Sequence, residues 1–282
     1  MDGLVTTEWL AGELGAPDLV VLDASYTSTI PGSPPGDPLG DYRAGHIPGA
    51  LFLGLDDLVD KADPRPSMLP PASVFAARME ALGIGNDRRI VLYEAGPHHT
   101  ACRAWWVLRM FGVENIALLD GAFAKWKAEG RPLESGEPAL EPRPFAIRPA
   151  IAEVRDLAAM RANVESGAEQ VADARSAARF TGAEPDPRAD CAAGHIPESR
   201  NIPSGSFFHA DGTWKRGAEL QAVFDAAGID LTKPLVATCG SGITAAIIAF
   251  GAHLLGRDAA LYDGSWSEWG ADPSTPKAVG AA

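Results

Sequence analysis

The pentapeptide Ala44-Gly45-His46-Ile47-Pro48 recurs as Ala193-Gly194-His195-Ile196-Pro197, with the two histidines 149 positions apart (195 − 46). Two further pairs of blocks keep the same order around it. A short run ending in aspartate precedes each copy, at 20–23 and at 170–173. A further block follows each copy, Leu-Leu-Asp-Gly at 118–121 and Leu-Tyr-Asp-Gly at 261–264. Matched blocks in one order indicate internal duplication. The sequence therefore predicts two copies of one domain.

Each half alternates short apolar runs with longer helix-like stretches. The second half gives strands at 235–238 and 259–262 around a helix at 243–255. The first half gives strands at 90–93 and 116–119 around a helix at 100–111. This alternation predicts an α/β fold in which each domain is a mainly parallel sheet with helices on both faces.

The domain limits follow from composition and from the repeat. We expect a first domain over 1–135, a linker over 136–150, a second domain over 151–275 and a tail over 276–282. The linker region is rich in Pro and Glu without periodicity. The chain after Pro273 is expected to be loose.

The overall charge restricts the partners. The net charge is −13 and the pI about 4.9, so we expect neither nucleic acid nor an anionic membrane as partner.

The N-terminus does not resemble a signal peptide. Three cysteines at 102, 191 and 239 fit neither a zinc site nor a disulfide framework. We therefore expect a cytoplasmic protein with reduced thiols and no metal.

The segment 238–245, Thr-Cys-Gly-Ser-Gly-Ile-Thr-Ala, places a cysteine between a strand and a helix. Ligands of open α/β sheets bind beyond the carboxyl ends of the strands. Glycines let successive N–H groups converge on an anion, and the helix start adds positive potential. Both effects favour a nucleophilic thiolate at Cys239. The alternative is a buried structural cysteine, which is the role we assign to Cys102, while Cys191 is expected in a loop.

Cysteine-dependent phosphatases also use such a loop, but they close it with an arginine six residues after the cysteine. That position here is Ala245. Hydrolysis of phosphate esters is therefore not expected.

The duplicated halves, the two Gly-His-Ile-Pro blocks and the cysteine-centred loop resemble tandem rhodanese-like sulfurtransferases, from about residue 4 to about residue 270. More narrowly, the loop is similar to that of the 3-mercaptopyruvate sulfurtransferase branch, with Ile243 where that branch usually has valine. The thiosulfate-using branch carries basic residues in this loop, and none occurs here between Cys239 and Ala245. The resemblance implies a persulfide on Cys239, with the substrate held around the loop by Gly240, Gly242, Ile243 and Thr244.

The segment 179–188 resembles the substrate-carboxylate segment of the same family, whose two arginines fall at Arg179 and Arg188. A planar guanidinium binds a carboxylate through paired, charge-assisted N–H bonds. The alternative is that both arginines pair with Glu184 and Asp186 at the surface.

The resemblance also implies that Ser241 acts with a histidine and an aspartate of the first half, which are His46 and Asp37 here. Such a relay removes a proton from the donor sulfur and delivers one to the leaving enolate. The alternative is that His46 and His195 both fix the turn at Ile-Pro. Asp41 lies close to Asp37 and weakens that assignment.

The first half lacks a sulfur carrier, because Ala95 aligns with Cys239. We expect it to be catalytically inactive and to form a lid and a wall of the cleft. His98 and His99 fall in its loop, either solvated or functional.

The expected reaction moves sulfur from 3-mercaptopyruvate through Cys239 to a thiol or cyanide acceptor and releases pyruvate, without a metal or organic cofactor. Small thiols or thioredoxin are the expected acceptors. The alternatives are a thiosulfate:cyanide sulfurtransferase and a non-catalytic binding or redox-sensing module.

Overall fold

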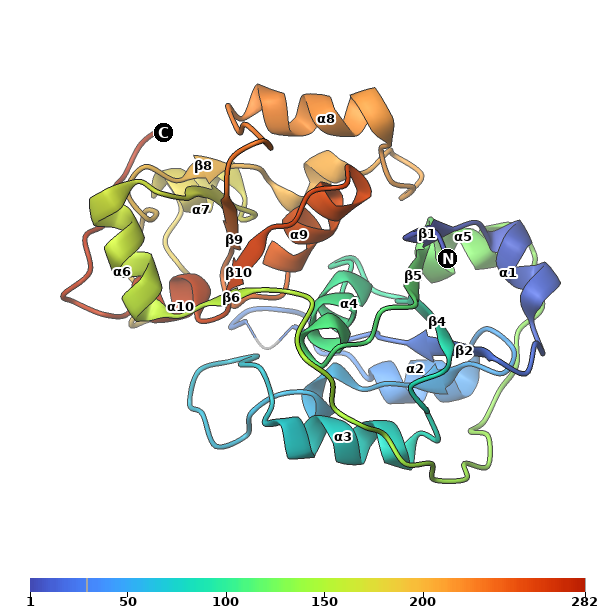
Figure 1. Ribbon diagram of the computed structural model, residues 1–282. Coiled ribbons are helices and arrows are strands. Elements are labelled where there is room, and N and C mark those ends of the chain that lie inside the picture. The colour runs from blue at the N-terminus through green and yellow to red at the C-terminus, as the bar shows by residue number, and fades with distance from the viewer. Residues whose placement is uncertain (29, 282) are drawn as a thin grey trace.

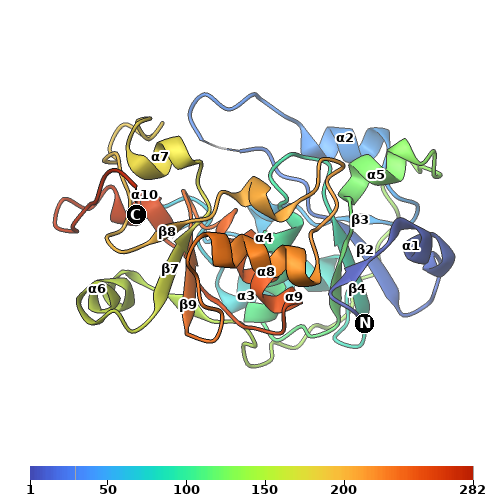
Figure 2. The ribbon, with the colours of Figure 1, turned by 90° about the horizontal axis from the view of Figure 1, so that it is seen from above.

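A computed structural model describes residues 1–28 and 30–281 of the chain, which form two α/β domains lying side by side (Figures 1 and 2). In these residues each domain contains a five-stranded sheet whose strand pairs are all parallel. The strand orders are β1-β5-β4-β2-β3 and β6-β10-β9-β7-β8. The two orders are the same, because β6 to β10 of the second sheet occupy the places of β1 to β5 of the first. The predicted fold class and the duplication are therefore confirmed.

The first domain runs from β1 to α5. Its strands are β1 (Leu4–Val5), β2 (Leu19–Asp23), β3 (Leu51–Phe52), β4 (Arg89–Tyr93) and β5 (Ile116–Leu119). Its helices are α1 (Thr7–Glu13), α2 (Pro38–Ala44), α3 (Ala72–Ala81), α4 (Ala101–Met110) and α5 (Ala122–Ala128), with a 3₁₀ turn at Leu55–Asp57.

The second domain repeats this pattern. Its strands are β6 (Val154–Arg155), β7 (Gln170–Asp173), β8 (Arg200–Asn201), β9 (Leu235–Thr238) and β10 (Ala260–Tyr262). Its helices are α6 (Leu157–Ser166), α7 (Ala177–Thr181), α8 (Gly217–Ala226), α9 (Ala245–Leu254) and α10 (Ser265–Trp269), with a 3₁₀ turn at Ser204–Phe207. The helix expected from residue 243 begins at Ala245, because residues 241–244 belong to the loop after β9.

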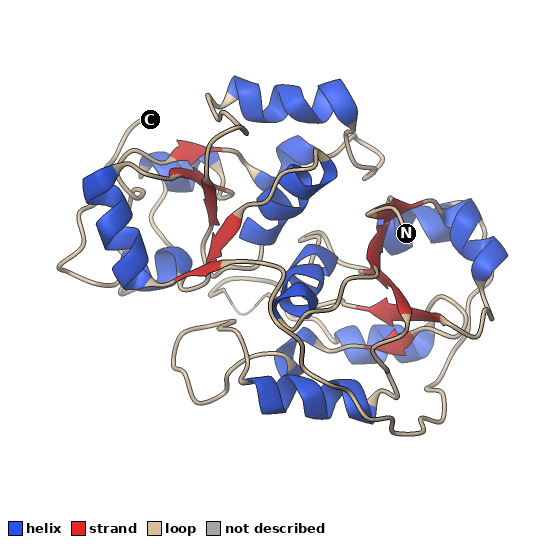
Figure 3. Cartoon of the chain, in the orientation of Figure 1, coloured by secondary structure: helices blue, strands red, loops and turns tan. Residues whose placement is uncertain are grey.

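Helices cover both faces of each sheet (Figure 3). Alternate residues of a strand point to opposite faces, so neighbours such as Val91 and Leu92 of β4 enter different cores. Val91 packs in the cluster that contains α1 and α5 residues, and Leu92 in the cluster that contains α3 and α4 residues. The buried apolar run of the central strand is explained by this double cover.

One hydrophobic cluster is continuous across the two domains. It passes through α4 and α9, which pack against each other where the domains meet (Figure 1). The ring of Trp105 on α4 meets that of Phe250 on α9 edge-on, with centroids 5.0 Å apart. The helices that follow the two matched loops thus join the halves.

The linker and the tail are both held by the domains. Phe145 is buried against Phe75 of α3, with ring centroids 5.6 Å apart, so the linker packs along the first domain. In the tail, Ala278 exchanges backbone hydrogen bonds of 2.8 and 2.9 Å with His195. The N–H of Gly280 also donates to the carbonyl of Thr181 at 2.8 Å. The expectation of a loose chain after Pro273 is therefore wrong as far as Gly280, and Ala282 lies outside the described residues. The domain limits themselves stay a prediction.

Among the described residues, no helix combines the length and the apolar character that crossing a membrane requires.

Candidate active site

Cys239 directly follows β9, at the carboxyl end of a central strand, and is 1% exposed. Its N–H donates to Ser265 Oγ at 3.2 Å, and its carbonyl accepts from the N–H of Trp266 at 3.0 Å. The carbonyl of Gly240 accepts from the N–H of Ser267 at 2.9 Å. The start of α10 therefore fixes the first two residues of the loop.

The rest of the loop leaves its N–H groups free for a ligand. Within residues 1–28 and 30–281, the backbone N–H groups of 240–244 have no hydrogen-bond acceptor. Gly242 makes the turn possible with a φ of 81°, a conformation that favours glycine. α9 begins immediately afterwards and adds the positive end of its dipole. These features suit an anionic sulfur at Cys239.

Two guanidinium groups lie beside the loop. A Cβ built on Gly240 would be 3.5 Å from Arg179 Nη2 and 3.5 Å from Arg188 Nη1. The prediction placed the positive potential in the backbone alone. The structure corrects this, since side chains from outside the loop also supply it.

Asp186 holds both arginines. Its Oδ2 pairs with Arg179 Nη2, and its Oδ1 pairs with Arg188 Nη1 at 3.2 Å and accepts from the Arg188 N–H at 3.0 Å. Burial alone would raise the pKa of Asp186, but these bonds outweigh it and hold that pKa below its usual value. Two guanidiniums and one carboxylate leave one net positive charge beside Gly240. Glu184, the other partner considered, is exposed.

A cavity of about 330 Å³ opens onto Cys239 between the two halves. The second domain contributes most of its wall, including Arg179, Cys239 and Ser241. The first domain contributes Tyr26 and His98, among others. The sequence had left His98 undecided, and its place on this wall makes it a candidate for the chemistry.

The predicted substrate-binding residues divide into two groups. Arg179, Gly240, Ile243 and Thr244 line the cavity, whereas Arg188 and Gly242 are not among its lining residues. A Cβ on Gly242 would lie 2.8 Å from the carbonyl oxygen of Asp263, so this glycine is needed for close packing of the loop.

His46 and Asp37 do not reach this cavity. His46 is 1% exposed, its ring stacks on Tyr42 at 4.0 Å, and its Nδ1 lies 2.8 Å from the Tyr42 carbonyl oxygen. Asp37 is the N-cap of α2 and accepts from the N–H of Gly40 at 2.9 Å. The geometry therefore agrees with the structural alternative for His46 and gives no support to the Ser-His-Asp relay.

His195 repeats the arrangement of His46. Its ring stacks on Phe180 at 3.8 Å, and its Nδ1 lies 2.8 Å from the Phe180 carbonyl oxygen. Both histidines also pair through their backbones with a later segment, at Glu134 and Ala278 respectively. The shared pattern holds the turn that begins at Ile47 in one copy of the pentapeptide and at Ile196 in the other.

In the first domain, the loop that matches the one at Cys239 contains a buried carboxylate side chain, that of Glu94. Glu94 is 4% exposed, and its carboxylate accepts from the N–H of Ala101 at 3.3 Å and lies 3.2 Å from His99 Nδ1. Ala95, opposite Cys239, is exposed. A buried carboxylate thus occupies the start of α4, where the second domain leaves N–H groups free.

The remaining cysteines differ from Cys239 in their surroundings. Burial raises the pKa of the Cys102 thiol, and Glu94 raises it further. Burial also raises the pKa of Cys191, with a contribution from Asp186. Neither environment favours a thiolate.

The model of the rhodanese-like domain matches the chain twice, over residues 6–129 and 156–272. The chain belongs to the rhodanese-like family. This rhodanese-like protein is 39% identical over 273 residues to 3-mercaptopyruvate sulfurtransferase of Homo sapiens, covering 94% of this chain and 91% of the relative. It is 40% identical over 275 residues to thiosulfate sulfurtransferase of Bos taurus, covering 94% and 91%.

A solved structure agrees with these relatives. The crystal structure of SseA from Escherichia coli, described as that of a 3-mercaptopyruvate sulfotransferase, matches with a TM-score of 0.85 at 34% identity and covers 95% of this chain and 100% of SseA. The predicted family and the predicted enzyme class, a sulfurtransferase, are confirmed.

Proposed function

We propose that this rhodanese-like protein takes sulfur from 3-mercaptopyruvate, carries it as a persulfide on Cys239 and passes it to a thiol or cyanide. The observation that supports this most is the pair of guanidiniums of Arg179 and Arg188 beside Gly240, the residue after the sulfur carrier. A monocarboxylate matches the single net positive charge that Asp186 leaves there.

Arg179 and Arg188 hold the donor carboxylate, and the loop surrounds the rest of the donor. The Cys239 thiolate attacks the donor sulfur, and a new S–S bond forms. The carbon–sulfur bond breaks, and its electron pair becomes the enolate of pyruvate. Protonation at carbon releases pyruvate and leaves one extra sulfur on Cys239. The free N–H groups of 240–244 stabilise that persulfide anion.

The proton transfer needs a group inside the cavity. Ser241 and His98 both line it, whereas His46 and Asp37 do not. We therefore propose that Ser241 and His98 take the proton from the donor sulfur and deliver a proton to the enolate, in place of a relay through His46.

Thiosulfate is the rival donor, and the bovine relative is named for it. Thiosulfate carries two negative charges, whereas this site offers one net positive charge and an uncharged loop. One charge of thiosulfate would therefore lose its water without gaining a partner, and this desolvation cost favours the monoanionic donor.

The net charge and the state of the cysteines bear on the partners and the location of the protein. We propose a small thiol or thioredoxin as acceptor and a cytoplasmic location. The net charge of −13 disfavours nucleic acid and anionic membranes as partners. Cys102, Cys191 and Cys239 are all unpaired, which suits a reducing compartment.

A side-by-side measurement of kcat/KM for 3-mercaptopyruvate and thiosulfate, with one common thiol acceptor, tests this proposal. We expect the higher kcat/KM for 3-mercaptopyruvate. A higher kcat/KM for thiosulfate would show that thiosulfate is the donor instead.

A further inference from the structure

A second cavity, of about 220 Å³, lies in the first domain beside the loop that lacks a cysteine. Tyr26, Ser28 and His98 line both this cavity and the cavity at Cys239. The two cavities are therefore neighbours that share part of one wall. The proposed reaction assigns nothing to the second cavity.

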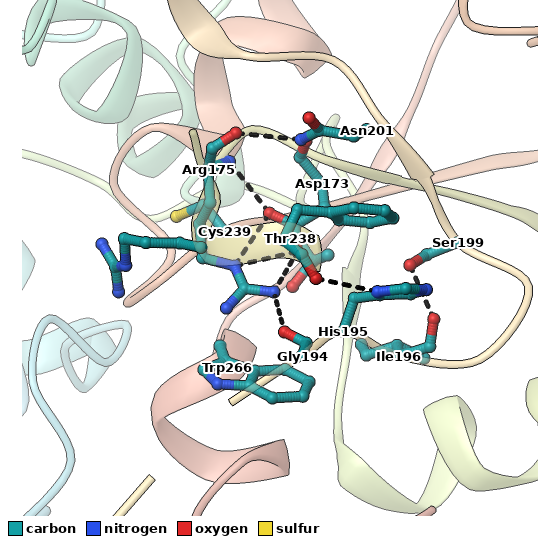
Figure 4. Close-up of polar contacts among 12 residues, drawn as sticks. Asp173, Arg175, Gly194, His195, Ile196, Ser199, Asn201, Thr238, Cys239 and Trp266 are labelled. Carbon is teal, nitrogen blue, oxygen red and sulfur yellow. Dashed lines mark hydrogen bonds and ion pairs between the residues drawn. The ribbon is translucent and has the colours of Figure 1, made fainter. Parts of the chain in front are cut away.

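The corresponding place in the second domain is filled by the guanidinium of Arg175 (Figure 4). Its Nη2 lies 2.7 Å from Asp173 Oδ2 and donates to the carbonyl of Gly194 at 2.8 Å. The guanidinium lies over the ring of Trp266, 4.4 Å from the centroid. A carboxylate, a carbonyl and an aromatic face thus enclose one buried cation.

The repeat gives the counterpart of each of these groups in the first domain. Asp23 matches Asp173 (173 − 23 = 150), Gly45 matches Gly194 (194 − 45 = 149), and Phe123 matches Trp266 (266 − 123 = 143). All three counterparts line the second cavity. The cavity therefore keeps the surroundings of the guanidinium.

The cation itself is absent from the first domain, because Ser25 stands where the second domain has Arg175 (175 − 25 = 150). The same local hydrogen bond forms in both domains, since the N–H of Ser25 donates to Asp23 and that of Arg175 donates to Asp173, each at 2.9 Å. Among the described residues, no basic side chain forms an ion pair with Asp23, which is 2% exposed. Burial raises the pKa of Asp23.

One cation does lie near this group of residues. The ammonium of Lys127 is 4.9 Å from the centroid of the Phe123 ring. Lys127 is exposed and does not line the cavity, so it leaves the place beside Asp23 open.

We infer that this cavity binds the ammonium or guanidinium group of a small thiol that accepts sulfur from Cys239. The inference rests on the proposed persulfide for the identity of the ligand as an acceptor. The cation takes the position that the Arg175 guanidinium occupies in the duplicate. The rest of the molecule extends past the shared wall toward Cys239.

The transfer balances without any other reactant. The acceptor thiolate attacks the outer sulfur of the persulfide, and a new S–S bond forms. The bond from that sulfur to Cys239 Sγ breaks, and its electron pair remains on Cys239 as a thiolate. The acceptor leaves as a hydropersulfide, with the proton that its thiol gave up.

Two substitutions test the cavity. Ser25→Arg supplies the guanidinium from the chain itself and recreates the arrangement at Arg175. Asp23→Asn removes the charge while it keeps the shape. Binding of methylguanidinium, measured by calorimetry on the full chain, requires no sulfur chemistry. We expect the wild type to bind and both variants to lose at least about 90% of the affinity, as for loss of a charge-assisted contact.

The acceptor role is measured on protein loaded with sulfur from inorganic polysulfide, so that it does not depend on the donor. The probes are 2-aminoethanethiol and 2-mercaptoethanol, which differ in an ammonium against a hydroxyl group. We expect the ratio of their transfer rates to fall about tenfold or more in both variants. The intrinsic reactivity of each thiol cancels in this comparison.

The outcomes separate this inference from the proposed function. Methylguanidinium binding that is absent from the wild type, or equal in all three proteins, overturns the cation site. Binding as expected with an unchanged rate ratio overturns the acceptor role. Failure of 3-mercaptopyruvate to load Cys239 would refute the proposed donor, but it leaves the binding measurement and the rate ratio on polysulfide-loaded protein decisive. If Ser25→Arg does not fold, Asp23→Asn carries the same test.

Discussion

Arg103 of α4 in the first domain forms an ion pair with Asp263 of the second, with Nη1 and Oδ1 2.8 Å apart and both side chains 4% exposed. The same guanidinium lies 3.4 Å from the carbonyl oxygen of Gly242 in the sulfur-carrying loop. The other oxygen of Asp263 accepts from the N–H of Leu69 at 2.7 Å. The domain without a cysteine thus helps to hold the loop of the domain that has one.

Arg103→Met should therefore harm both the fold and the chemistry. Removing one partner of a buried ion pair leaves an uncompensated charge and costs about 3–5 kcal/mol. We expect a lower free energy of unfolding in urea and slower formation of the persulfide on Cys239. An unfolding free energy within about 0.5 kcal/mol of wild type, with an unchanged rate, would refute the role given to this pair.

Arg179→Ala and Arg188→Ala should each weaken the use of 3-mercaptopyruvate. Loss of a charge-assisted contact lowers kcat/KM by about 10- to 100-fold. Lysine should restore only part of it, because it lacks the planar fork. Arg161→Ala is the matched control, since Arg161 pairs with Asp272 on the surface of the same domain. Equal steady-state kinetics in all of these variants would show that the carboxylate is held elsewhere.

Asp186 should stabilise the fold in a pH-dependent way. Its pKa in the folded protein lies below the ordinary value of 3.8, so the unfolded chain takes up a proton first as the pH falls. Its contribution is complete above the unfolded pKa and is lost as the pH falls through the folded pKa. We expect Asp186→Asn to lower the free energy of unfolding at pH 7 and to have a smaller effect near pH 3. Urea unfolding at both pH values checks this, and an equal loss at both would contradict it.

Loop charge should influence the choice of donor. Arg at position 240 would meet the guanidiniums of Arg179 and Arg188, so Ser241→Lys is the better substitution. At an effective dielectric near 20, a charge pair about 4 Å apart interacts by roughly 4 kcal/mol before desolvation. Even a quarter of that should raise the ratio of thiosulfate to 3-mercaptopyruvate kcat/KM several-fold. Ser241→Met adds length without charge, and an equal shift in both variants would exclude charge as the cause.

The fold could be predicted from the sequence because the domain is duplicated, so the same strand, helix and turn patterns occur in both halves. The copies of the pentapeptide at His46 and His195 occupy the same structural position, and the strand before Cys239 was expected at 235–238, which are its observed bounds. Periodicity could not show that the tail pairs with His195, because a single bridge leaves no pattern in the sequence.

The site was predicted less completely. Arg179 and Arg188 lie beside the loop, and their pairing with Asp186 was expected only as the alternative to substrate binding. In the structure both hold at once, because Asp186 keeps the two guanidiniums next to Gly240. The contributions of Arg103 and His98 come from the other domain. Contacts between domains depend on how two cores meet, and neither domain's own pattern encodes that. His46 was left with two alternatives, a proton relay or a structural role at the turn, and its stacking on Tyr42 could not be foreseen from either.

The role of Cys239 as the sulfur carrier can be measured by peptide mass spectrometry after incubation with 3-mercaptopyruvate. We expect a gain of about 32 daltons, one sulfur atom, on the peptide that contains Cys239 and not on those of Cys102 or Cys191. A thiol acceptor should remove the added mass, and Cys239→Ser should fold yet release no pyruvate. Pyruvate release at a near-normal rate from Cys239→Ser, or a sulfur gain confined to another cysteine, would show that Cys239 is not the sulfur carrier.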